Sequence, residues 1–115
     1  MASGELPPRG THEVDLLSGA VRVSLHGEFD LSTETELVTW LRQALLDHPG
    51  MDLHVEVSGV SFLDSSGIRA LLRSQSAAVA HGRGFRLTGA QGTIREVLEI
   101  VDVYDLLTGH QPTPS

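Results

Sequence analysis

The stretch Phe62-Leu63-Asp64-Ser65-Ser66-Gly67-Ile68 joins a predicted strand to a predicted helix, and the interpretation of the whole chain starts from it. Before it, Leu53, Val55 and Val57 alternate with polar residues, which is the two-residue period of a strand. The apolar residues that follow at helical spacing are Ile68, Leu71, Leu72 and Val79. Asp and Ser side chains accept hydrogen bonds from the first N–H groups of a helix, so Asp64 or Ser65 is expected to be the N-cap.

Strands and helices are predicted to alternate along the rest of the chain. Strands are expected over 14–17 and 21–25, joined tightly at Ser18-Gly19, and Ser32 or Thr33 is expected to cap a helix. The apolar face of that helix comprises Leu37, Leu41, Ala44 and Leu45. A strand containing Phe85 and Leu87, a short helix with Ile94 and Leu98, and a last strand over 103–107 complete the prediction. Helices between strands imply crossover connections and a mixed, mainly parallel sheet.

Two landmarks resemble a known family. The Asp64 stretch resembles the signature of STAS domains, specifically the bacterial anti-sigma factor antagonists (anti-anti-sigma factors), and Gly27-Glu28-Phe29-Asp30-Leu31 resembles the family's turn between the second strand and the first helix. The resemblance covers roughly residues 14–107. It implies an α/β, STAS-like single domain: a mixed sheet of four to five strands packed with about three to four α-helices.

The resemblance also implies a function. Such a protein binds an anti-sigma factor that is a serine kinase, frees a sigma factor to regulate transcription in a stress response, and is released when the kinase phosphorylates it. The phosphorylated residue is expected to be Ser65, with Ser66 as the alternative, and a serine phosphatase is expected to reset the switch. A phosphate there would face free N–H groups and the positive end of a helix dipole. The residues expected to bind the partner are Glu28, Asp30, Asp64, Ser65, Ser66, Gly67 and Ile68.

Composition excludes several other classes of protein. The chain of 115 residues has no cysteine, so it has no disulfide framework or cysteine nucleophile. Its formal charge is −7 and its eight basic residues form no cluster, which argues against nucleic-acid binding. No apolar run reaches the roughly 20 residues that span a bilayer, so a cytoplasmic protein without membrane insertion is expected.

No catalytic chemistry is predicted. The Gly-x-Ser-x-Gly elbow of hydrolases is absent, the histidines lack metal-ligand spacing, and the lysine that a phosphate-accepting response regulator needs has no candidate. We therefore expect no enzyme activity, no cofactor and no metal.

Some alternatives stay open from sequence. Asp64 and its serines are also what a plain helix cap requires, and exposed acids such as Glu28 and Asp30 are common in solvated loops. The chain could instead be a STAS accessory or sensor module of a transporter or larger signalling complex, and homodimer formation is undecided. Residues 1–10 and 110–115, rich in Pro and small residues, are expected to be flexible tails around a domain over 11–109.

Overall fold

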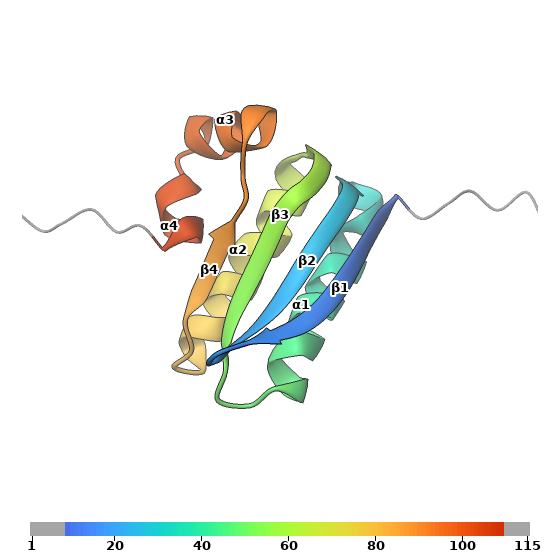
Figure 1. Ribbon diagram of the computed structural model, residues 1–115. Coiled ribbons are helices and arrows are strands. Elements are labelled where there is room, and N and C mark those ends of the chain that lie inside the picture. Colours follow the sequence, from blue (N-terminus) through green and yellow to red (C-terminus); the bar gives the residue numbers. More distant parts are fainter. Residues whose placement is uncertain (1–8, 110–115) are drawn as a thin grey trace, which may run out of the picture.

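The computed structural model describes residues 9–109 and shows one sheet covered on one face by two helices (Figure 1). The elements, in chain order, are β1 (Gly10–Leu17), β2 (Ala20–Phe29), the short 3-10 helix η1 (Leu31–Thr33), α1 (Glu34–Asp47), β3 (Asp52–Leu63), α2 (Ser65–Ala80), β4 (Phe85–Thr88), α3 (Gly92–Ile100) and α4 (Tyr104–Thr108). The predicted α/β class is confirmed, with four strands and four α-helices.

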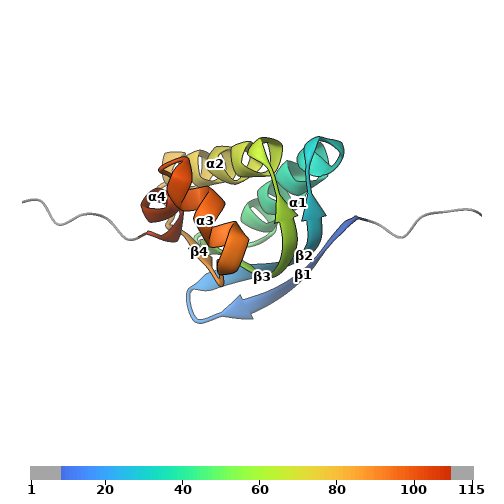
Figure 2. The same cartoon turned by 90° about the horizontal axis from the view of Figure 1, so that it is seen from above.

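The sheet has the order β1-β2-β3-β4. β1 and β2 form an antiparallel hairpin in which Leu17 pairs with Ala20, so the predicted turn at Ser18-Gly19 is confirmed. The β2–β3 and β3–β4 pairs are parallel, because a helix crosses over between the strands of each pair. Figure 2 shows α1 and α2 side by side on the same face of the sheet, with α3 and α4 beyond the β4 edge.

The core lies between the sheet and helices α1 and α2. The predicted apolar face of α1 is buried, with every member at most 5% exposed: Leu37, Leu41, Ala44 and Leu45. The alternating residues Leu53, Val55 and Val57 of β3 are buried against it, as the two-residue period predicts. On α2, Ile68 and Leu71 are buried, but Val79, which lies in the same predicted helix, is 56% exposed and is not part of the core.

The strand predicted over 103–107 is wrong, because these residues form α4 and the turn before it. Val103 and Leu107 both pack on the core, and they stand four positions apart, which is helical spacing. The N–H of Leu107 donates to the carbonyl of Val103 at 3.0 Å, so the hydrogen bond is helical as well.

The first residues of the described chain belong to the fold. Gly10 is the first residue of β1, one residue before the expected domain start at 11. The N–H of Glu28 donates to the carbonyl of Arg9 at 2.7 Å, and Gly27 has a φ of +99°, where a Cβ would lie 2.1 Å from that carbonyl oxygen. A glycine is therefore required at 27 for β1 to approach β2. The rest of the predicted tails, 1–8 and 110–115, lies outside the described residues.

No helix within residues 9–109 is both long enough and apolar enough to cross a membrane.

Candidate functional site

The candidate site lies where β2 and β3 end, side by side, at the same edge of the sheet (Figure 1). Phe29, the last residue of β2, pairs with Leu63, the last residue of β3. An aspartate follows each of them: Asp30 is the N-cap of η1 and Asp64 is the N-cap of α2. The parallel register therefore brings the two predicted landmarks of the sequence together at one edge.

Asp64 is the N-cap of α2, which decides between the two residues that the sequence left open. Its Oδ1 accepts hydrogen bonds from the N–H groups of Ser66 at 2.8 Å and Gly67 at 3.3 Å. Its own N–H donates to the carbonyl of Phe29 at 3.3 Å, which ties the cap to the end of β2. The carboxylate also lies at the positive end of the helix dipole, where a negative charge is stabilised.

The first turn of α2 is therefore not an empty anion site. The free N–H groups expected around a phosphate on Ser65 are in part occupied, since those of Ser66 and Gly67 already donate to Asp64. A phosphate on Ser65 would gain from the helix dipole but would lie next to a carboxylate. The fold offers this phosphate less local stabilisation than the sequence suggested.

The two serines differ sharply in accessibility. Ser65 is exposed, whereas Ser66 is only 6% exposed. The Oγ of Ser66 accepts a hydrogen bond from Nη2 of Arg69 at 3.4 Å. A modifying enzyme could therefore reach the hydroxyl of Ser65, while that of Ser66 faces inward.

Gly67 and Ile68 of the predicted partner-binding set are buried. A Cβ on Gly67 would lie 2.4 Å from Cδ1 of Leu63 and 2.9 Å from the carbonyl oxygen of Phe29, so the close approach of α2 to both strand ends needs glycine. Ile68 is 6% exposed and belongs to the core. Gly67 and Ile68 therefore pack the first turn of α2, which carries Ser65, against the core. The predicted partner-binding residues at the surface are Glu28, Asp30, Asp64 and Ser65.

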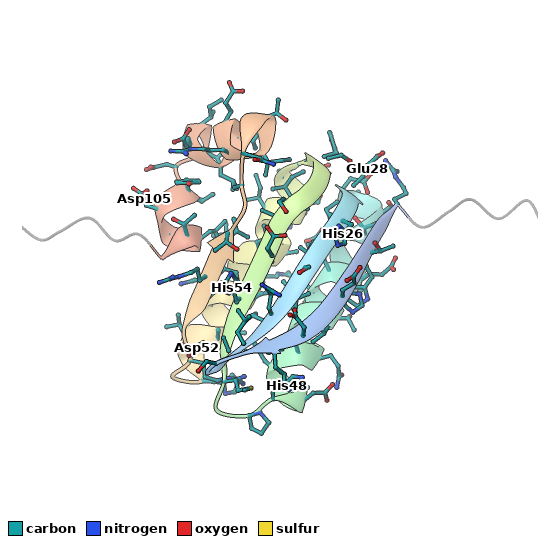
Figure 3. All side chains as sticks on the ribbon, in the orientation of Figure 1. His26, Glu28, His48, Asp52, His54 and Asp105 are labelled. Carbon is teal, nitrogen blue, oxygen red and sulfur yellow. The ribbon has the colours of Figure 1, made fainter. Side chains whose placement is uncertain are left out.

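The acidic turn is partly neutralised by Arg9, a residue that the sequence analysis did not single out. Nη2 of Arg9 lies 2.9 Å from Glu28 and 2.8 Å from Asp30, so one guanidinium bridges both carboxylates. Hydrogen bonds from Ser32 and the charge of Arg9 hold the pKa of Asp30 below its usual value. Figure 3 shows Glu28 at the end of β2, at the same edge of the sheet.

Asp30 also orders the start of the next helix, where the sequence predicted Ser32 or Thr33 as the cap. Its Oδ1 accepts hydrogen bonds from the N–H of Ser32 at 2.9 Å and from the hydroxyl of Ser32 at 2.6 Å. The N–H of Asp30 donates to the hydroxyl of Thr33 at 2.9 Å, which completes a capping box around η1. Thr33 is the residue before α1, but its side chain makes no cap hydrogen bond there.

A second missed arginine connects α1 with α2. Arg69 holds Glu34 by a two-point ion pair, with Nε and Nη2 at 2.7 and 3.0 Å from the two carboxylate oxygens. The hydrogen bond from Arg69 keeps the pKa of Glu34 below its usual value. Arg69 is four residues after Ser65 on the same helix, and that spacing was visible in the sequence.

Two apolar side chains are exposed at the same end of the sheet as Ser65. Leu31, directly after Asp30, is 72% exposed, and Phe62, two residues before Asp64, is 45% exposed. Phe62 pairs in register with Glu28. We call Glu28, Leu31, Phe62, Asp64 and Ser65 the Ser65 surface. It combines exposed apolar side chains with polar and charged ones, and protein interfaces likewise join apolar and polar contact area.

Within residues 9–109 there is no cluster of three or more side chains that could ligate a metal ion.

Comparison with known protein families gives a match to a model described as "Mlab, STAS domain", which covers residues 12–108. A search of curated protein sequences gives no match.

Solved structures similar to this chain include several anti-sigma factor antagonists. One from Mycobacterium paratuberculosis is 27% identical, with a TM-score of 0.75 and coverage of 90% of this chain and 86% of that one. The unphosphorylated form of the antagonist SpoIIAA is 21% identical, with a TM-score of 0.62 and coverage of 82% and 83%. The phosphorylated form of SpoIIAA, a Bacillus cell fate determinant, is 18% identical, with a TM-score of 0.62 and coverage of 85% and 88%. The last two are similar in fold alone.

Proposed function

Since the chain belongs to the STAS domain family, we propose that it is an anti-sigma factor antagonist that works by a phosphorylation-controlled partner switch. In its unphosphorylated form it binds an anti-sigma factor that is a serine kinase, and thereby frees a sigma factor. The kinase transfers the γ-phosphoryl group of ATP to the Oγ of Ser65, with release of ADP and the hydroxyl proton. The chain is a substrate and competitor in this cycle, and it catalyses no step. A cycle that consumes ATP belongs in the cytoplasm.

The observation that carries the proposal is the exposed hydroxyl of Ser65 on the Ser65 surface. Its neighbour Ser66 is buried and hydrogen-bonded to Arg69, so the two candidates are not equivalent. The mycobacterial antagonist with 27% identity supports the same class of function. A known phosphorylated form of SpoIIAA supports the same type of control.

Charge accounts for release of the partner. Phosphorylation adds about 1.5 to 2 negative charges at neutral pH. At 4 Å and an effective dielectric constant near 20, two unit charges interact with about 4 kcal/mol. Asp64 already places one carboxylate directly before Ser65, and a phosphate would add more negative charge than the surface of the bound partner is matched to. About 1.4 kcal/mol of repulsion lowers affinity tenfold, so a modest fraction of this energy releases the complex.

The test is phosphorylation by the host's anti-sigma factor kinases with ATP, followed by mass mapping of the modified residue. Wild type and Ser18→Ala, which removes an exposed hydroxyl in the β1–β2 turn, should be phosphorylated equally. Ser65→Ala should lose the modification. Undiminished phosphorylation of Ser65→Ala would assign the modification to another residue and defeat the proposal.

A second candidate function remains, because the matched family model is described as "Mlab, STAS domain" and does not name an anti-sigma factor antagonist. In this alternative the chain is an accessory module of a transporter and binds its partner without being phosphorylated. Affinity purification from the host with and without ATP separates the two. A kinase released by ATP supports the partner switch, and a transport ATPase retained under both conditions supports the accessory module.

A further inference from the structure

A groove runs between α1 and α2 on the surface of the molecule that faces away from the sheet. It holds two adjoining cavities of about 610 and 510 Å³, which share Arg42, Leu45 and Ala77 in their linings. The cavities reach from Arg69 near the start of α2 to His81 just past its end. At 1.5 Å per residue, this stretch of α2 is roughly 18 Å long.

The floor of the groove is apolar. Val38 and Leu45 of α1 face Leu72 and Ala77 of α2. Leu46, in the second cavity, is 66% exposed and extends the apolar area toward the end of α1. An apolar floor open to solvent along its length is typical of a surface that receives a helix.

The rim of the groove is positively charged. Arg42, Arg69 and Arg73 line it, and no carboxylate is among the residues that line either cavity. Arg69 is neutralised by Glu34, but within residues 9–109 neither Arg42 nor Arg73 forms an ion pair. In a chain with 15 acidic residues and eight basic ones, a cationic rim on an apolar floor is a local inversion of the overall charge.

We propose that this groove binds an acidic amphipathic helix of a partner protein, about three turns long, with its apolar stripe on the floor and its carboxylates against Arg42 and Arg73. The cations are distributed along both walls, which suits several carboxylates spaced on a helix better than one headgroup. The alkyl chain of a lipid or fatty acid would also remain largely exposed to water in this open groove, whereas ligand pockets enclose most of their ligand. Ser65 lines neither cavity, although Arg69, one helical turn after it, does, so the test below uses the unphosphorylated protein.

The experiment uses a labelled synthetic peptide of about 14 residues, with Leu at helical i, i+4, i+7 and i+11 positions and Glu on both flanks. A second peptide carries Lys in place of every Glu. Fluorescence anisotropy measures their binding to wild type, to Arg42→Gln/Arg73→Gln, and to the matched control Arg86→Gln/Arg95→Gln. The control removes the same charge from arginines outside the groove. Circular dichroism melting of each variant verifies folding.

The acidic peptide should bind wild type and the control double variant within about twofold of each other, and the groove double variant about tenfold more weakly or worse. The basic peptide should bind wild type about tenfold more weakly than the acidic one. Absence of acidic peptide binding at about 1 mM, or equal binding to both double variants, would overturn the proposal. Binding of myristate without peptide binding would indicate a small amphiphilic anion instead. Self-association that requires Arg42 and Arg73, measured by light scattering, would indicate that the groove binds a second copy of the chain. Myristate binding without peptide binding and such self-association would each overturn the proposal.

Discussion

Arg69 and Glu34 form a two-point ion pair between α2 and α1, and Arg69 lies one helical turn after Ser65. A phosphate on Ser65 would therefore compete with Glu34 for the same guanidinium. Asp64 acts in the opposite direction, because its carboxylate disfavours a second negative charge nearby. The charges of Arg69, Glu34 and Asp64 thus determine how strongly the fold stabilises a phosphate on Ser65.

The second ionisation of a phosphate on Ser65 should report this competition. We expect its pKa to be higher in Arg69→Gln than in wild type, because the variant loses a cation one helical turn from the dianion. Titration of the phosphorylated proteins by ³¹P NMR measures both values against the usual pKa of about 6. The control is phosphorylated Arg95→Gln, which removes an arginine from α3. If the phosphate on Ser65 has the same pKa in Arg69→Gln and in wild type, Arg69 remains paired with Glu34 and does not bind the phosphate.

Replacement of Asp64 should destabilise the fold without any partner. Asp64→Ala leaves the N–H groups of Ser66 and Gly67 without their cap, and loss of an N-cap costs about 0.5 to 2 kcal/mol. Asp64→Ser retains an acceptor and should cost less. The free energy of unfolding in urea checks the order. An Asp64→Ala protein as stable as wild type would mean that Asp64 serves partner binding and not the helix.

Gly67→Ala should also destabilise the protein, although alanine favours an exposed helix position by about 1 kcal/mol over glycine. The added Cβ would meet Leu63 at 2.4 Å and the backbone of Phe29 at 2.9 Å. Overpacking of this kind typically costs about 1 to 3 kcal/mol, so α2 must move away from the strand ends. Urea unfolding measures the loss, and a gain in stability would contradict the close approach described for this helix.

The sequence predicted the alternating elements well because each has a strong period. Leu53, Val55 and Val57 alternate as a strand does, and the apolar face of α1 repeats as a helix does. The short C-terminal segment has too few residues to show a period, so α4 was mistaken for a strand. Val79 is apolar and lies in the predicted helix, yet it is exposed, because only the packing of α2 decides which side chains the sheet covers.

Only part of the candidate site was predictable from the sequence, because some of its contacts join residues that are far apart in the chain. Asp64 and Ser65 stand in one local motif, and the motif was enough to identify them. Arg9 reaches Glu28 and Asp30 across at least 19 positions of sequence, and Arg69 reaches Glu34 across 35. No local pattern encodes such pairs, since they follow from strand register and from the way that α1 lies against α2.

His12 should titrate below the usual histidine range. Its ring stacks on Trp40 with ring centroids 4.2 Å apart, and burial lowers the pKa of His12. Folding thus favours the neutral form of His12. The contribution of the neutral ring to stability is fully present above the unfolded-state pKa of about 6.5. It is lost as pH falls through the lower folded value. NMR titration of His12 checks the direction. His12→Phe should reduce the loss of stability between about pH 7 and 5. A normal pKa for His12 would contradict the burial.

Ser65→Asp should mimic phosphorylation only in part. One carboxylate supplies a single negative charge, against about 1.5 to 2 for a phosphate, and lacks its third oxygen. Partner affinity should therefore fall in the order wild type, Ser65→Asp, phosphorylated protein. Ser65→Asn is the matched control, since it has nearly the same size as Asp but no charge. Calorimetric titration with the kinase measures all four forms. If Ser65→Asn loses as much affinity as Ser65→Asp, bulk at this position and not charge releases the partner; if Ser65→Asp equals the phosphorylated protein, one charge is sufficient.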